Sequence, residues 1–272
     1  MKTALIQMPV TADKAANLEK AAEMAAEAKA GGAQVIVLPE MFCCPYTNSY
    51  FIEFAEEKGD RVWTALSEIA KENKVILVGG SMPELDGGKI YNTCFVFNEN
   101  GEQIACHRKI HLFDIYVKGG QHFKESDTFT AGDSVTVFDC SLGRLGVMIC
   151  FDIRFPELSK LMTLQGAQAI IVPAAFNMTT GPVHWELSFR QRAVDNQLFM
   201  LGCAPARDTE GVYVSYANSI VTGPWGNVLA RAGAEECILY ADLDLTENER
   251  IRQQLPLLKA RRTDLYDVVI KN

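Results

Sequence analysis

Three chemically reactive side chains lie at the ends of short apolar segments. Glu40 ends the run VIVLPE, Lys109 lies in CHRKIHLFD, and Cys150 ends GVMIC just before the charged stretch FDIRFPEL. A structural cysteine packs as a small hydrophobe, whereas a nucleophilic cysteine needs a group that removes its proton. Together the three groups predict a nucleophilic site. The carboxylate would take the thiol proton and later activate water, and the ammonium would lower the thiol pKa and stabilise an oxyanion.

Each of these residues also has an ordinary structural interpretation. A cysteine at a strand end is usually core, a glutamate after proline often begins a helix, and a lone lysine is usually solvated. A cysteine–histidine pair is a further alternative, and the local spacing does not decide between histidine and glutamate as the base. The histidines available for it are His107, His111, His122 and His184. Cys94, Cys106, His107 and His111 only faintly imitate a zinc site, because they would lie along a hairpin, so we expect no metal.

The elements that must position these residues follow from the apolar periodicity. Strands are predicted at residues 1–7, 34–40, 75–84, 167–177, 198–205, 216–233 (a pair) and 237–245, with hairpins at 90–111 and 134–150. Helices are predicted at residues 12–30, 61–71, 156–165, 185–197 and 247–254. Because helices alternate with fully apolar strands, the pattern predicts an α/β fold of mixed sheets covered by helices. In such folds ligands bind at the carboxyl ends of the strands.

Composition narrows the class of protein. The 272 residues are 48% hydrophobic with a net charge of −8, which disfavours a nucleic-acid partner. No linker divides the chain, so residues 1–272 are predicted to form one domain with an extended tail from about residue 255. We expect no membrane span and no signal peptide, because the apolar runs are too short. The eight cysteines contain no CxxC pair, which favours reduced thiols and a cytoplasmic location.

Three motifs, in order, resemble those of a known superfamily. VIVLPEMF, HRKIHLFD and GVMICFDIRFPEL closely resemble the motifs of the nitrilase superfamily of carbon–nitrogen hydrolases, and the resemblance extends to the RRTDLYDV tail. It implies a four-layer α-β-β-α sandwich that uses no metal or organic cofactor. The superfamily's Glu–Lys–Cys triad maps onto Glu40, Lys109 and Cys150, and its second glutamate maps onto Glu125 in HFKESDTF.

The same resemblance predicts how the cysteine is held. Cys150 would sit where a strand turns sharply into a helix. The Phe151 backbone N–H would join the Lys109 ammonium as an oxyanion donor. We expect Asp152 and Arg154 to hold the turn by ion pairing.

Other stretches resemble the omega-amidase branch more than nitrilases proper. They are AAFNMTTGPVHWEL, QRAVDNQLFM, APARD, GPWGNVLARAGAEE and IRQQLPLLKARRTDLY. This implies hydrolysis of the terminal amide of a small omega-amido acid, such as 2-oxoglutaramate, 2-oxosuccinamate or succinamate, through a cysteine thioester. The substrate's distal carboxylate would need a cation or several donors. The candidates are Arg154, Tyr46, Thr179, Thr180 and His184. The FNMTTGP stretch is equally interpreted as a tight loop without ligand contact.

Several rival functions stay open at this point. The triad would also serve an amidase of deaminated glutathione or of N-carbamoyl compounds, and a cysteine–histidine peptidase is the other enzyme class. A non-catalytic interaction subunit on the same fold is disfavoured because all four site residues are present. The resemblance further implies a homodimer or larger homo-oligomer, built through the helices at 156–165 and 185–197, which carry apolar residues on more than one face. Alternatively, both helices are simply core.

Overall fold

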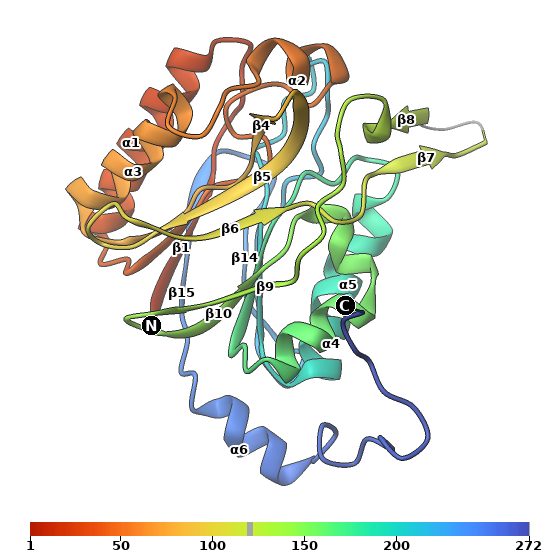
Figure 1. The fold of residues 1–272 in the computed structure, drawn as a ribbon. Helices are drawn as coiled ribbons and strands as arrows, with labels where there is room; N and C mark the ends of the chain where they lie inside the picture. Colours follow the sequence, from red (N-terminus) through yellow and green to blue (C-terminus); the bar gives the residue numbers. More distant parts are fainter. Residues whose placement is uncertain (119–121, 272) are drawn as a thin grey trace.

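Two β-sheets stack face to face and carry helices on their outer faces (Figure 1). The computed structural model describes residues 1–118 and 122–271. The layers run α-β-β-α, so the predicted fold class is confirmed. Helices α1 (Lys14–Ala30) and α3 (Arg61–Asn73) cover one sheet. Helices α4 (Pro156–Leu164) and α5 (Gly181–Asn196) cover the other.

The first sheet has seven strands and the second has six. In spatial order the first contains β15 (Cys237–Asp242), β1 (Lys2–Gln7), β2 (Val35–Val37), β3 (Ile76–Val78), β5 (Lys89–Phe97) and β4 (Met82–Asp86), with β6 (Gln103–Arg108) also paired to β5. The second contains β14 (Val228–Arg231), β13 (Ile220–Thr222), β12 (Phe199–Cys203), β11 (Ala169–Pro173), β10 (Gly143–Val147) and β9 (Thr136–Cys140). The central strands β1–β2–β3 and β10–β11–β12 run parallel.

Side-chain alternation along the strands builds two apolar layers. Leu5 packs into the core between the sheets, while Ala4 and Ile6 pack toward α1 and α3. Both faces of the first sheet are therefore buried, which is why its parallel strands are continuously apolar in sequence. In the second sheet the core between the sheets and the contacts with α4 and α5 form one cluster.

Some elements differ from the sequence prediction. The run at residues 75–84 forms two strands, β3 and β4, because the chain kinks at Gly80, whose φ is +53°. Both strands run in the same direction and pair antiparallel with β5. Helix α5 begins at Gly181, four residues earlier than predicted, with Pro182 in its first turn, where a missing N–H is harmless. The helix α2 (Asn48–Phe54) and the small hairpin of β7 (Asp114–Tyr116) and β8 (His122–Lys124) were not predicted.

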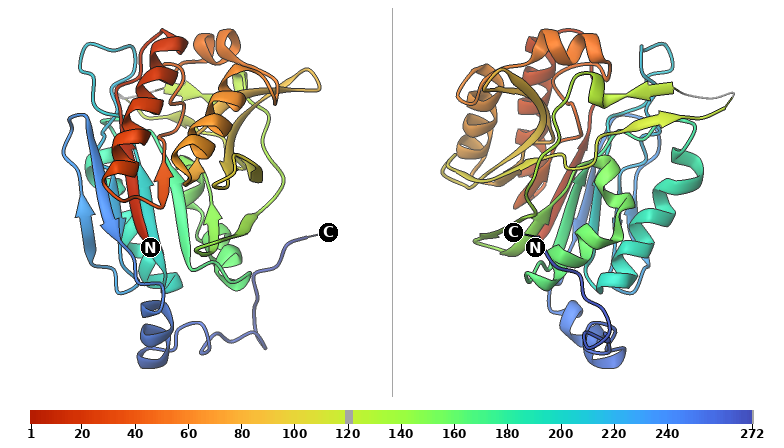
Figure 2. Two further views of the ribbon diagram at one scale, coloured as in Figure 1. Left: turned by 90° about the vertical axis from the view of Figure 1, so that its left-hand side faces the viewer. Right: turned by 45° about the vertical axis from the view of Figure 1, so that its right-hand side comes forward.

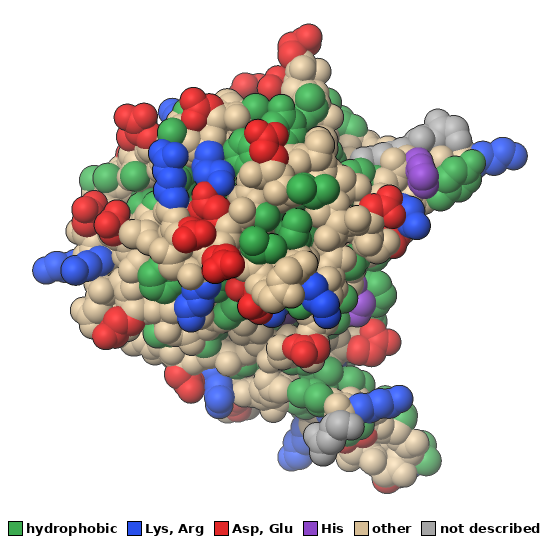
Figure 3. All heavy atoms as spheres, turned by 45° about the horizontal axis from the view of Figure 1, so that its top comes forward, with side chains coloured by type: hydrophobic (Ala, Val, Ile, Leu, Met, Phe, Trp, Pro, Cys, Tyr) green, Lys and Arg blue, Asp and Glu red, His purple; other side chains and the backbone are tan. Residues whose placement is uncertain are grey.

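The C-terminal region lies outside the sandwich. Helix α6 (Glu247–Gln254) has the predicted bounds, and residues 255–271 run away from the body without a regular element (Figure 2). None of the helices in the described part of the chain combines the length and apolarity that crossing a bilayer requires. On the face seen in Figure 3, acidic side chains are widely spread, and basic ones lie between them.

Candidate active site

Cys150 sits at a strained turn between strand β10 and a short 3₁₀ helix, Cys150–Arg154. Its φ is +46°, a left-handed conformation that a non-glycine residue adopts at an energetic cost. The side chain is almost completely buried. The turn is closed by the Asp152 N–H, which donates to the Ile149 carbonyl oxygen. The predicted change from strand to helix at Cys150 is confirmed.

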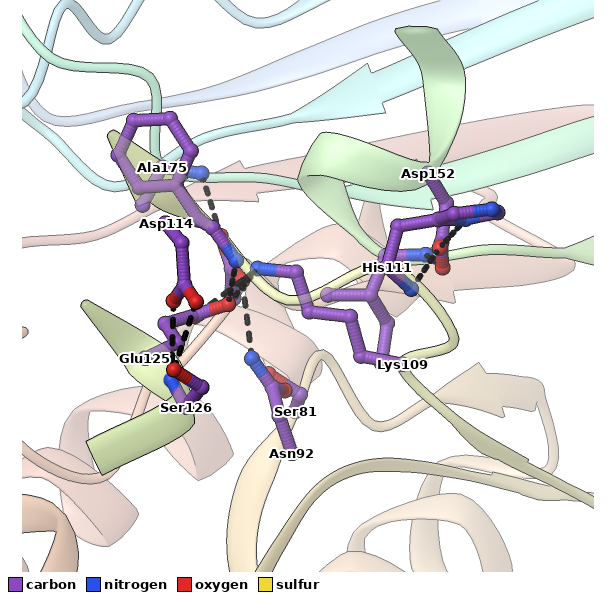
Figure 4. Close-up of polar contacts among 12 residues, drawn as sticks. Ser81, Asn92, Lys109, His111, Asp114, Glu125, Ser126, Asp152 and Ala175 are labelled. Atoms are coloured by element: carbon purple, nitrogen blue, oxygen red, sulfur yellow. Dashed lines mark hydrogen bonds and ion pairs between the residues drawn. The ribbon is translucent and has the colours of Figure 1, made fainter. Parts of the chain in front are cut away.

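A buried ammonium lies between two buried carboxylates next to this turn (Figure 4). Lys109 Nζ is 2.9 Å from Glu40 Oε1 and 2.9 Å from Glu125. The Tyr46 hydroxyl is the third group on the ammonium, 3.3 Å from Nζ, and it lies 2.5 Å from Glu125 Oε1. The three protons of the ammonium therefore have three oxygen partners, and the group is fixed in position.

Further donors hold the two carboxylates. Glu40 accepts from Asn92 Nδ2 at 3.0 Å and from the Ala175 N–H at 2.9 Å. Glu125 accepts from the Phe113 N–H at 2.6 Å. Because Ala175 follows β11 while Glu40 follows β2, the site joins the two sheets. A buried carboxylate with several such donors keeps one orientation.

Burial and charge set the protonation states. Burial lowers the pKa of Lys109, but the charges of Glu125 and Glu40 outweigh this and raise it above its ordinary value. Burial, and then the Glu40 charge, raises the pKa of the Cys150 thiol well above its ordinary value, although Lys109 acts in the opposite direction. The ammonium thus lowers the thiol pKa as expected, but burial and the Glu40 charge outweigh it and leave the pKa raised. Two carboxylates already face one ammonium, so the resting cysteine is a thiol.

Asp152 and Arg154 do not pair with each other, which corrects the sequence prediction. The Asp152 carboxylate lies 3.1 Å from His107 Nε2 and 2.7 Å from His111 Nδ1. The Arg154 guanidinium instead lies 3.1 Å from Nδ1 of His184. Residues two apart on one turn point in different directions, so histidines from the β6 arm reach Asp152.

Two spaces of different size meet at the site. A cavity of about 320 Å³ is lined by Glu40, Tyr46, Ala175, Asp208, Glu210 and Tyr213, among others. A cleft of only about 10 Å³ adjoins Cys150 and is lined by Phe113, Phe151, Arg154, Ala175, Phe176 and Thr180. The cleft has room for about one water. An acyl group can extend toward Arg154 only if that side chain moves.

The structure distributes the candidate substrate-binding residues over several places. Thr180 and Arg154 line the cleft beside Cys150, and the Arg154 guanidinium lies 4.8 Å from the ring centre of Phe176. Thr179 and His184 are exposed, and His184 contacts the cleft only through Arg154. Tyr46 belongs to the ammonium cluster.

Sequence reasoning missed Asn92, the Ala175 N–H and the partners of Asp152. The signal for the last was the alternation of His107, Lys109 and His111 along one strand arm. His122 lies against the Tyr116 ring, so each of the four histidines has a neighbour other than the thiol. Within residues 1–118 and 122–271, no three acidic, histidine or cysteine side chains are grouped to hold a metal.

Comparisons with known proteins agree with this geometry. The family model described as carbon-nitrogen hydrolase matches residues 2–253. The chain is 48% identical to omega-amidase NIT2 of Bos taurus, over 99% of this chain and 98% of the relative.

Solved structures share the fold. The chain is similar to Nit3 of Saccharomyces cerevisiae, a member of branch 10 of the nitrilase superfamily, with a TM-score of 0.89, 43% identity and 96% of each chain covered. It is also similar to an amidase from Nesterenkonia sp. AN1, with a TM-score of 0.81, 27% identity, and 97% and 98% covered. The chain therefore belongs to the carbon–nitrogen hydrolase family of the nitrilase superfamily and is a hydrolase of carbon–nitrogen bonds.

Proposed function

We propose that this enzyme hydrolyses the terminal amide of a small omega-amido carboxylic acid, releasing ammonia and a dicarboxylic acid. Suitable substrates are 2-oxoglutaramate, 2-oxosuccinamate and succinamate. The similarity to omega-amidase NIT2 supports the reaction. The observation that carries the substrate class is Arg154, a half-buried guanidinium that lines the same cleft as Cys150.

Acylation begins with the Cys150 thiol. As its sulfur attacks the amide carbon, Glu40 takes the thiol proton. The Phe151 N–H and the Lys109 ammonium stabilise the oxyanion that forms. Glu40 then gives the proton to the departing nitrogen, the C–N bond breaks, ammonia leaves, and the acyl group remains as a thioester on Cys150.

Deacylation uses the same groups in reverse roles. Glu40 takes a proton from a water that attacks the thioester carbon, and the oxyanion donors act again. The C–S bond breaks, the sulfur recovers its proton from Glu40, and the carboxylic acid leaves. The cycle consumes one amide and one water and yields one acid and one ammonia.

Glu125 and Tyr46 would keep Lys109 in place through this cycle. The Tyr46 contact is the longest of the three on the ammonium, at 3.3 Å. We infer that the oxyanion takes this donor, while both carboxylates keep theirs. Glu125 would thus act by positioning the ammonium. Holding reacting groups in the correct geometry contributes much of an enzyme's rate enhancement.

The distal carboxylate would bind Arg154. Burial lowers the pKa of this guanidinium, so its charge is poorly compensated by its surroundings. Among the described residues, the guanidinium contacts Nδ1 of His184 and the ring faces of Phe151 and Phe176. None of these contacts is a carboxylate. These weak partners permit the side-chain shift that the narrow cleft requires. Thr180 lines the same cleft, with its N–H and hydroxyl donating to Asn177 Oδ1.

A paired substrate panel tests this proposal. Succinamate and butyramide have comparable chains, but only succinamate carries the carboxylate. We expect wild-type kcat/KM to favour succinamate, and Arg154→Gln to lower succinamate turnover about 10–100-fold, the worth of one charged hydrogen bond, with butyramide nearly unaffected. Arg154→Lys should recover part of the loss. Equal wild-type rates for both amides, or faster cleavage of deaminated glutathione, would overturn the substrate class.

We also propose that residues 1–272 form one domain whose C-terminal tail begins near residue 255, and that the enzyme is a cytoplasmic homodimer. All eight cysteines are free, which agrees with a reducing compartment.

On α5, Phe189 is buried within its own chain while Val183 and Leu187 are more than 60% exposed. The helix thus has one core face and one exposed apolar face, which suits an interface.

A further inference from the structure

We propose that Asp152, which is hydrogen-bonded to His107 and His111, is a positioning residue. It holds the Cys150 thiol in the correct position relative to the Lys109 ammonium. This inference rests on the proposed role of Cys150 as nucleophile. The inference adds a structural element to the proposed Glu–Lys–Cys triad. One arm of the chain positions both the ammonium and the turn that carries the thiol.

The arm is the end of β6 and the residues just after it. His107, Lys109 and His111 alternate in sequence, so their side chains leave the same side of the arm. Arg108, between them, points away and pairs with Glu84 at 2.8 Å. Lys109 reaches the Glu40 carboxylate, and the histidines on either side of it reach Asp152. Figure 4 shows His111 pointing toward Asp152.

Asp152 accepts four hydrogen bonds, two on each oxygen. Oδ2 accepts from His107 Nε2 at 3.1 Å and from the Ile149 N–H at 3.1 Å. Oδ1 accepts from His111 Nδ1 at 2.7 Å and from the His111 N–H at 2.9 Å. The Ile149 contact ties the residue just before Cys150, so the carboxylate closes the strained turn and anchors it to the arm.

The carboxylate is completely buried, and these contacts compensate its charge. Burial would raise the pKa of Asp152, but the hydrogen bonds from His107 and His111 hold it below its ordinary value. An acceptor-only group surrounded by donors cannot be replaced by an amide, because the amide N–H₂ would face donors. The site therefore requires a carboxylate.

Two substitutions at His111 separate its hydrogen bond from its packing. Its ring stacks on Phe155 with centres 3.6 Å apart, and the side chain is 29% exposed, so changes here are tolerable for folding. His111→Phe keeps a ring for the stack and loses the donor. His111→Asn loses the ring and keeps a side-chain N–H near the place of Nδ1.

The test measures kcat, KM and thermal unfolding for these variants and for Asp152→Asn. We expect His111→Phe to lower kcat for succinamate at least 10-fold with KM changed less than threefold, and His111→Asn to stay within about threefold of wild type, because misplacing the thiol slows acylation without weakening binding. Asp152→Asn should lose at least 100-fold. Glu84→Gln is the matched control: it removes a buried carboxylate of β4 that binds Arg108 of the same arm and Thr93 of β5, and not the Cys150 turn. It should lower stability and leave kcat near wild type.

Every outcome decides the matter. Equal activity of the two His111 variants, whether high or low, overturns the inference. It is also overturned if Glu84→Gln loses as much kcat, relative to its loss of thermal stability, as His111→Phe and Asp152→Asn do. If Asp152→Asn does not fold, the His111 pair still decides. Turnover retained in Cys150→Ala would instead refute the proposed function itself, so the two failures are distinguishable.

Discussion

As the nucleophile that we propose, Cys150 would start its reaction as a neutral thiol, and this would separate it from thiolate–imidazolium enzymes. Burial and the Glu40 charge both raise its pKa, and the ammonium of Lys109 is already shared by two carboxylates. The base therefore has to act during attack. This favours glutamate over histidine as the proton acceptor, a choice that the local sequence left open.

The first residue-scale prediction concerns pH. A thiol with a raised pKa gains thiolate as pH rises and stays mostly protonated at pH 7. We expect the rate at which iodoacetamide inactivates the enzyme to keep rising through about pH 8.5, the ordinary cysteine pKa, without a plateau. Mass spectrometry should place the inactivating label on Cys150, while labels on Cys106, Cys140 and Cys237 leave turnover intact. A rate that is already constant near pH 6 would mean a preformed thiolate.

Residue-scale reasoning from sequence had clear limits. Glu40, Lys109 and Glu125 were paired correctly in space by the motif resemblance, since buried opposite charges near strand ends have few other partners. Asp152 and Arg154 were mispaired because nearness in sequence was taken for nearness in space. The actual partners of Asp152, His107 and His111, are 45 and 41 residues away, and the stacking of the two sheets brings them there.

At the scale of elements, the turn that carries Glu40 depends on a glycine. Gly80 has φ +53°, and a Cβ there would lie 2.2 Å from the carbonyl oxygen of Pro39, the residue before Glu40. The two turns lie against each other because β2 and β3 are neighbouring parallel strands that end together. A side chain at Gly80 must push the Glu40 turn away.

We therefore expect Gly80→Ala to impair both stability and activity. The left-handed conformation costs about 1–2 kcal/mol and the forced overpacking about 1–3 kcal/mol more. A displacement near 1 Å at Glu40 would lower kcat about 100-fold. Gly87→Ala is the control, because Gly87 has φ +56° and open space around its Cβ position. Gly87→Ala should lose only the stability that the left-handed conformation costs, and it should keep full activity. Similar kcat values for both variants would contradict this account.

Elements were predictable where their periodicity was long. Helix α1, with its 17 residues, and the β5–β6 hairpin matched well, the latter around its Asn98–Gly101 turn. The seven residues of α2 span barely two turns, and β7 and β8 have three residues each, so no period could emerge. The layer order came from the resemblance, since alternation alone indicates only that mixed sheets are covered by helices.

At the scale of the whole molecule, α5 presents an exposed apolar face. Leu187 is 63% exposed and Trp225, beside it, is 59% exposed; together they border a hollow of about 390 Å³. Leu158, Met162 and Phe189 are fully used in the core, so the alternative interpretation of the helices as core holds for these residues. In the dimer that we propose, the outer face of α5 would carry an isologous contact.

We expect sedimentation at micromolar concentration to give about twice the chain mass of 30.1 kDa. Leu187→Asp should shift the enzyme to a monomer, because a buried unpaired charge weakens an interface by several kcal/mol. Ile52→Asp is the matched control, since Ile52 is 61% exposed on α2, away from this face. A wild-type monomer, or equal dissociation of both variants, would rule out the interface.

The order of strands in the first sheet also has a consequence during synthesis. Strand β1, near the start of the chain, lies between β2 and β15, and Lys2 pairs with Asp242. Until the ribosome has released β15, one edge of β1 has unpaired N–H and C=O groups and can recruit strands from other chains. The sheet that positions Glu40 is thus completed only when nearly the whole polypeptide is available, a connectivity that slows folding and exposes the nascent chain to aggregation. Demand for chaperones should accordingly be greatest just before the final strand emerges.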